Sequence, residues 1–225
     1  MMPPELARAL RALPHRYPRE GRDYWGLDQA LPDPDRVRAR LLASEGWVHG
    51  APVRKEPWPG MRAMPALLPE ELEPIERWVR SQVGVRRLQQ GVVAEGNVLN
   101  HNCVQAVGAR DSGPRPHTDM KSLATWAGVL YLSPDVPETC GTSFYRVRLA
   151  DGTLGGNRVP DPHDNLIAAL GTRYVPPTLF VEEVAVPHRY NRLLVYPADI
   201  IHSASGYWGD SLETRRMTAL FFWKR

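Results

Sequence analysis

Two stretches in the second half of the chain decide the fold class: TWAGVLYL at residues 125–132 and TSFYRV at residues 142–147. Both are short, rich in β-branched and aromatic residues, and bounded by residues typical of turns, which is the pattern of a β-strand. Seven segments of this kind follow one another from about residue 90, the others being 91–93, 102–107, 180–186, 192–196 and 216–222. Because no long helical pattern separates them, they predict an antiparallel sandwich or barrel.

The first third of the chain has a different pattern, which predicts helices. A short helix is expected near the N-terminus, where leucines recur at helical spacing. Asp33 and Pro34 are expected to start a second helix, since Asp is a good N-cap and Pro suits the first turn. A third helix is expected over about 69–83, where apolar residues follow helical spacing up to Gly84.

We expect residues 1–225 to form one domain with a mainly β, α+β architecture. Residues 1–90 would form a mostly helical flank that packs on the sheet, and residues 91–225 would form the β core. Between residues 149 and 178 the chain is rich in Gly, Pro and Asp. An insertion of this length in a compact domain is typically a lid, a binding loop or a disordered segment.

The composition narrows the class of protein further. Apolar residues make up 43% and charged residues 24%, which excludes global disorder. The formal net charge is only +3, so nucleic acid is not an expected partner. Neither an apolar run of about 20 residues nor a signal-peptide pattern occurs, and we expect a cytoplasmic protein. The two cysteines, Cys103 and Cys140, are too few for a disulfide framework.

Metal chemistry is suggested by His117 and Asp119, which are separated by one residue. On an extended strand their side chains point to the same face and can occupy adjacent corners of one coordination sphere. Such a pair is common by chance, so a third ligand must come from elsewhere, and His202 follows the apolar strand over 192–196. Two imidazoles and one carboxylate suit Fe(II), whereas Zn(II) would use the same residues in a tetrahedral site.

An anchor for an acidic co-substrate follows 14 residues after His202, at Arg216. The planar guanidinium makes two parallel hydrogen bonds to a carboxylate. Thr218 would share the face of Arg216 and add a hydroxyl. The residues after Thr218 show little alternation between apolar and polar side chains, so the sequence does not decide which of the two neighbouring arginines faces inward. Arg215 therefore remains an alternative for this role.

Taken in order, these segments resemble the Fe(II)/2-oxoglutarate-dependent oxygenase superfamily, above all its prolyl-hydroxylase-like branch and related small bacterial oxygenases. The resemblance covers residues 91–225 and rests on five motifs: His117 to Asp119, VLYLS at 129–133, CGTSF at 140–144, RLLVYP at 192–197 leading to His202, and Arg216-x-Thr218. It implies a double-stranded β-helix, the jelly-roll of cupin-like proteins, with a metal at one mouth.

The resemblance also implies a reaction. His117, Asp119 and His202 would be the catalytic iron ligands, and 2-oxoglutarate and O2 would be converted while a C–H bond is hydroxylated, releasing succinate and CO2. Ascorbate would serve as reductant in vitro. Asp119 is a carboxylate rather than the small residue of the family's halogenases, which disfavours halogenation.

Co-substrate residues are implied in the same way. Arg216 would bind the C5 carboxylate of 2-oxoglutarate, assisted by Thr218 and Tyr131. Val107 stands where the prolyl hydroxylases have a second tyrosine, and Gln105 or Asn102 would compensate for it.

The substrate itself is expected to be a small molecule, an amino acid or a short peptide. Candidate substrate contacts are Asn102, Trp126, Tyr207 and Trp208. Two alternatives remain: a jelly-roll metal-binding protein without turnover, and a zinc- or nickel-dependent cupin-like enzyme that does not use 2-oxoglutarate. Oligomeric state and reaction outcome have no readable signal in the sequence.

Overall fold

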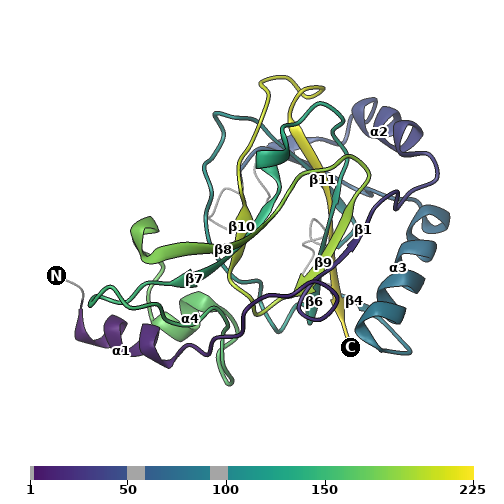
Figure 1. Cartoon of the computed structure of the whole chain (residues 1–225). Coiled ribbons are helices and arrows are strands. Elements are labelled where there is room, and N and C mark those ends of the chain that lie inside the picture. The colour runs from purple at the N-terminus through teal and green to yellow at the C-terminus, as the bar shows by residue number, and fades with distance from the viewer. Residues whose placement is uncertain (1–2, 50–58, 92–100) are drawn as a thin grey trace.

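The computed structural model describes residues 3–49, 59–91 and 101–225. Most of the regular structure is antiparallel β-sheet, with helices at the periphery (Figure 1). The expected mainly β architecture with flanking helices is therefore confirmed. The strand expected at 91–93 falls almost entirely outside the described residues.

Two sheets make up the β core. The larger sheet contains β1 (Trp25–Leu27), β2 (Val48–His49), β3 (Met61–Ala63), β4 (Gln89–Gln90), β5 (Cys103–Val107), β6 (Trp126–Tyr131), β9 (Leu193–Pro197) and β11 (Arg216–Lys224). Its order is β1-β9-β6-β11-β5-β3-β2, with β4 also paired to β11. The smaller sheet contains β7 (Thr142–Val147), β8 (Phe180–Val186) and β10 (His202–Ala204), in the order β10-β7-β8.

Within the described residues, four helices flank the sheets: α1 (Pro4–Ala12), α2 (Pro34–Leu42), α3 (Pro69–Val83) and the short α4 (Leu166–Leu170). Of these, α2 and α3 begin at the residues expected from the sequence. The Asp33 side chain accepts a hydrogen bond from the Arg36 N–H at 3.0 Å and caps α2. Gly84 ends α3 with φ 69°, a left-handed conformation that favours glycine.

The first third of the chain contributes strands as well as helices, so the expectation of a mostly helical flank is incomplete. β1 pairs with β9, and β3 pairs with β5. These strands have three residues each, which is too short for a two-residue periodicity to be visible in the sequence.

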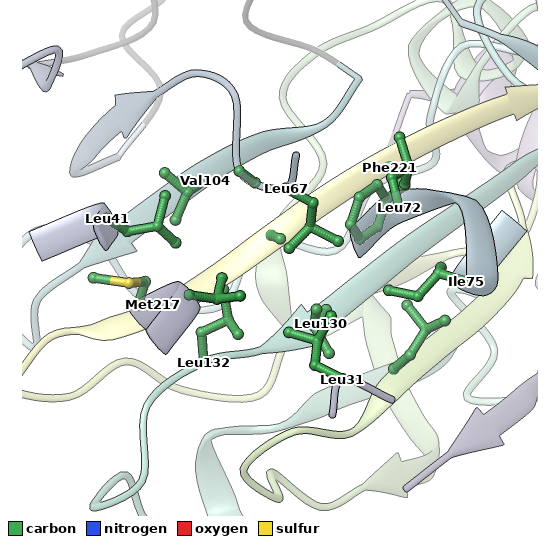
Figure 2. Packing of buried hydrophobic residues seen from close by; sticks show 14 of the residues in the cluster. Leu31, Leu41, Leu67, Leu72, Ile75, Val104, Leu130, Leu132, Met217 and Phe221 are labelled. Atoms are coloured by element: carbon green, nitrogen blue, oxygen red, sulfur yellow. The ribbon is translucent and has the colours of Figure 1, made fainter. Parts of the chain in front are cut away.

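The central strands of the larger sheet, β5, β6, β9 and β11, are buried on both faces. Alternate residues of its strands, such as Met217 and Leu130, pack against α2 and α3 in the cluster that Figure 2 shows. The opposite face, which we call the concave face, packs against the smaller sheet through a second cluster, in which Phe144 and Val186 come from β7 and β8. The other members are Ala127, Val129, Tyr131, Leu194, Tyr196 and Ile200. Strands buried on both faces read as nearly continuous apolar runs, which explains why β11 alternates so little in sequence.

The segment 149–178 is packed onto the rest of the molecule. Its helix α4 lies against α1 (Figure 1), and together with β7 they bury a third cluster made of Leu6, Leu10, Leu13, Val147, Val159, Leu166, Leu170 and Ile201. None of the helices within the described ranges is long and apolar enough to cross a membrane.

Candidate metal centre

His117 and His202 lie side by side because their backbones pair. The His117 N–H donates to the His202 carbonyl at 3.0 Å, and the His202 N–H donates to the His117 carbonyl at 2.8 Å. The two imidazole centroids are 4.5 Å apart. The Asp119 N–H donates to the Ala198 carbonyl at 3.0 Å, which holds the carboxylate beside them. One ligand atom of each of these three residues lies within 4.8 Å of the others.

Hydrogen bonds fix which imidazole nitrogens face the centre. Nδ1 of His117 lies 2.8 Å from the Arg115 carbonyl, and Nδ1 of His202 lies 3.0 Å from the Ile200 carbonyl. Because a carbonyl only accepts, both Nδ1 atoms carry the hydrogen, and Nε2 is the nitrogen with the lone pair. A backbone hydrogen bond of this kind orients a metal-ligating histidine.

The carboxylate of Asp119 fits a cation. Among the described residues, its buried Oδ2 has no hydrogen-bond partner, and it lies 3.6 Å from Nε2 of His202. Burial raises the pKa of Asp119 to about 6, and burial together with His117 lowers the pKa of His202 well below its ordinary value. Near neutral pH the site therefore offers an ionised carboxylate and a neutral imidazole, the forms that bind a metal.

A row of polar side chains crosses the concave face next to this centre. Thr218 pairs with Tyr131 on one side and with Gln105 on the other, and Gln105 pairs with Arg62. Directly paired residues of antiparallel strands project to the same face. We call Arg62, Gln105, Thr218 and Tyr131 the polar row.

Arg216 lies two residues before Thr218 on β11, opposite Val107, and so projects to the same face as Thr218. Its side chain is 3% exposed, and its Nε and Nη2 donate to the carbonyls of Cys140 and Gly141 at 2.6 and 3.0 Å. Arg215 projects the other way, with Nη2 3.7 Å from Oδ1 of Asp111. The arginine that reaches the concave face is thus Arg216.

Two hydroxyls accompany this arginine. The buried Oγ1 of Thr218 has no hydrogen-bond partner among the described residues. The Tyr131 hydroxyl donates to Oγ1 of Thr142 at 2.8 Å, and its ring centroid lies 5.4 Å from the guanidinium carbon of Arg216. A guanidinium beside an unpaired buried hydroxyl suits the carboxylate of a bound acid.

Residues 8–219 match the model of a protein family described as "Family of unknown function (DUF6445)". The chain belongs to this family. A search of curated protein sequences gave no match to this DUF6445 chain.

Solved structures of similar fold include three with TM-scores above 0.5. SnoN, a "non-heme alpha ketoglutarate dependent epimerase" from nogalamycin biosynthesis, has a TM-score of 0.53 and 20% identity, over 98% of this chain and 84% of that one. AviO1 from Streptomyces viridochromogenes Tue57 has a TM-score of 0.51 and 13% identity, over 99% of this chain and 96% of AviO1. SnoK, a "non-heme alpha ketoglutarate dependent carbocyclase" from nogalamycin biosynthesis, has a TM-score of 0.51 and 16% identity, over 99% of this chain and 83% of SnoK. The DUF6445 chain thus has the expected double-stranded β-helix fold.

Not every candidate from the sequence lies at the centre. Asn102 precedes β5 with φ 55°, and its amide group bonds both the N–H and the carbonyl of Leu67, at 2.9 and 2.8 Å. It holds the chain before α3, so its placement does not support a contact with co-substrate or substrate. Gln105 does lie in the polar row, where its Nε2 donates to the Pro59 carbonyl at 3.1 Å.

The aromatic candidates separate in the same way. Trp126 packs against the cluster beneath α2 and α3, which we call the helix-side cluster, on the opposite face of β6 from Tyr131. This placement does not support a contact with substrate on the concave face. Tyr207 lies over Arg216, with 5.8 Å between ring centroid and guanidinium carbon. Trp208 is 46% exposed, and its backbone carbonyl accepts the Arg216 N–H at 3.1 Å. Of the three, Tyr207 is the one placed at the concave face.

Arg62 also lies on the concave face, although no sequence pattern predicts it. Arg62 is 3% exposed, and its neighbour Ala63 belongs to the helix-side cluster, so Arg62 points inward. An arginine between the apolar residues Met61 and Ala63 is a weak hint at most, because the strand has only three residues.

The insertion at 149–178 braces the loop that carries two of the candidate ligands. Oγ1 of Thr118 accepts the Leu166 N–H at 2.8 Å in a buried hydrogen bond. Asp164 accepts the Ser122 N–H at 2.6 Å through its carboxylate and the Lys121 N–H at 2.9 Å through its carbonyl. This part of the insertion therefore holds the loop from outside the centre.

Proposed function

We propose that the chain is a cytoplasmic Fe(II)- and 2-oxoglutarate-dependent oxygenase that hydroxylates a small molecule, an amino acid or a short peptide. The observation that carries the proposal is the cluster of the half-buried His117 and Asp119 with the buried His202, on the same concave face as Arg216. The likeness in fold to SnoN and SnoK, two alpha ketoglutarate-dependent enzymes, at TM-scores of 0.53 and 0.51, is consistent with it.

Three protein ligands suit Fe(II) because they leave up to three octahedral positions open. Nε2 of His117, Nε2 of His202 and the Asp119 carboxylate would hold the metal. Bound iron, with 2-oxoglutarate and O2, supplies oxidation of a C–H bond, and 2-oxoglutarate leaves as succinate and CO2. The backbone bonds described above keep the imidazoles oriented, so that the ligands are in place before the metal arrives.

The protein's own groups position the co-substrate and exclude water. Arg216 would bind the distal carboxylate of 2-oxoglutarate, since its carbonyl contacts fix the guanidinium on the concave face. Thr218 would donate its unpaired hydroxyl to the same carboxylate. Apolar residues of the concave cluster, including Val129 and Leu194, shield the reacting groups from solvent, which strengthens polar contacts inside the site.

The test is an anaerobic titration of the Fe(II)-loaded protein with 2-oxoglutarate, followed by its weak visible charge-transfer band. We expect the band in the wild type and a dissociation constant at least tenfold higher in Arg216→Gln, because charge-assisted hydrogen bonds are lost. Arg215→Gln is the matched control and should bind normally. Arg216→Lys keeps the charge and, with thermal melting, separates lost binding from misfolding.

The alternatives give different results in this titration. A cupin-like enzyme without 2-oxoglutarate would bind metal through the same three residues, show no band, and respond equally to substitution of Arg216 or Arg215. A binding protein without turnover would show the band but form no succinate in air with ascorbate and any candidate substrate. Either result would contradict the proposed oxygenase.

A further inference from the structure

Arg62 ends the polar row on the side away from Tyr131. It lies on β3, pairs with Gln105 of β5, and is 3% exposed. Burying a guanidinium is costly unless it serves a charge or a set of acceptors. Arg62 has interactions of its own within the protein, and its position places a positive charge on the concave face of the candidate active site.

The position of Arg62 differs from that of Arg216. β5 lies between their strands, and neighbouring strands are about 4.8 Å apart, so the backbones of Arg62 and Thr218 are roughly 10 Å apart. The two arginines therefore bring two positive charges to one face from separate strands. The distal carboxylate of 2-oxoglutarate would bind the one at Arg216.

Arg62 also belongs to the metal end of this face. Burial lowers the pKa of Arg62, and the charges of Cys103 and Asp119 act against that fall. Burial raises the pKa of the Tyr207 phenol, while the charges of Arg216, Arg115 and Arg62 act against that rise. Positive groups thus surround Tyr207, which itself lies over Arg216.

The formal charges of the loaded site do not require Arg62. Fe(II), ionised Asp119, dianionic 2-oxoglutarate and Arg216 cancel one another. A guanidinium has five N–H donors, so Arg62 can keep its contacts within the protein and still bind a further anion.

We propose that Arg62 binds a carboxylate of the substrate, so that the enzyme acts on a small organic acid anchored at this end of the polar row. The inference rests on the proposed function and deepens it by naming the substrate class. Anchoring by a bidentate carboxylate contact fixes orientation as well as position, which decides the C–H bond that faces the metal.

The test uses simple acids as probes and compares them with uncharged analogues. Benzoate and butyrate, with benzamide and butyramide, are titrated anaerobically into the protein loaded with Fe(II) and 2-oxoglutarate. Binding is measured by calorimetry and by the change in the visible band, and the calorimetry is repeated on metal-free protein. The variants are Arg62→Gln, Arg62→Lys and, as matched control, Arg215→Gln.

We expect the wild type and Arg215→Gln to bind the acids at least tenfold more tightly than the amides. Arg62→Gln should lose this preference while its dissociation constant for 2-oxoglutarate changes less than twofold, and Arg62→Lys should retain part of the preference. Acids and amides that bind equally, or acids that do not bind, would overturn the inference. A tenfold loss of 2-oxoglutarate affinity in Arg62→Gln, with the acid preference intact, would overturn it too.

This design separates the two proposals. Wild-type protein that fails to bind 2-oxoglutarate with Fe(II) refutes the oxygenase, whereas the acid preference in metal-free protein is measured independently. An intact 2-oxoglutarate titration without any preference for acids refutes the role of Arg62 alone.

Discussion

Replacing Thr218 by Val should affect folding and co-substrate binding in opposite directions. The Thr218 side chain is 1% exposed, and its hydroxyl is unpaired among the described residues. A buried unsatisfied polar group costs roughly 1–3 kcal/mol, and Val has nearly the same shape and suits a strand. We therefore expect Thr218→Val to stabilise the ligand-free protein by about 1 kcal/mol, raising Tm by roughly 2–4 °C for a chain of this size.

The same substitution should weaken 2-oxoglutarate binding. A hydrogen bond to a charged acceptor contributes roughly 1.5–3 kcal/mol, which corresponds to a roughly 10- to 150-fold higher Kd. Differential scanning calorimetry of the ligand-free protein and an anaerobic titration of the Fe(II)-loaded protein measure the two effects separately.

Thr142→Val is the contrasting control for this prediction. Oγ1 of Thr142 already accepts the Tyr131 hydroxyl, so its loss leaves a buried phenol unpaired and should destabilise the protein by roughly 1–3 kcal/mol. Thr218→Val that lowers Tm, or that leaves the Kd for 2-oxoglutarate unchanged, would refute the assignment of its hydroxyl to the co-substrate.

Three further predictions concern the surroundings of the centre. Asp164→Ala should weaken Fe(II) binding several-fold, because Asp164 holds the loop that carries His117 and Asp119. Asp161→Ala removes only an exposed ion pair to Lys121 and should leave Fe(II) binding unchanged. Equal Fe(II) affinities of the two variants in metal titrations would contradict this prediction. Burial lowers the pKa of His188 to about 4 from 6.5, so the unfolded chain takes up a proton before the folded one does. Stability should then fall by up to roughly 3 kcal/mol as the pH drops from 6.5 to 4, and His188→Gln should flatten that loss in urea titrations; an unchanged slope would count against it. A Cβ at Gly141 would lie 2.0 Å from the Val186 carbonyl oxygen, so Gly141→Ala should destabilise the protein by roughly 2 kcal/mol or more in thermal melts. A Cβ at Gly46 would lie 3.4 Å from the nearest atom, Oγ of Ser44, so Gly46→Ala should be nearly neutral.

Much of the fold was predictable because its signals are local. Strands such as β6, β7 and β8 are long enough to show their composition, and α2 and α3 carry capping residues at their ends. The convergence of His117, Asp119 and His202 followed from the order and spacing of motifs, and their role as iron ligands stays a prediction.

The rest depended on pairings that no local pattern encodes. The inward direction of Arg216 was open because β11 is buried on both faces, with Met217 against the helices and Thr218 against the concave side. The inward direction of Arg62 could not be predicted, because β3 has only three residues and is too short to show an alternation of buried and exposed positions. The positions of Asn102 and Trp126 could not be predicted, because backbone conformation and strand parity, rather than residue type, decide where their side chains point.

The most direct test of the account is the Fe(II) stoichiometry of the purified protein under anaerobic conditions. One Fe(II) per chain is expected in the wild type, with binding lost in His202→Ala and in Asp119→Ala and retained in His163→Ala, a histidine outside the cluster. Wild-type protein that binds no Fe(II), or binding that survives both ligand substitutions, would contradict the central claim that these three side chains form one metal centre.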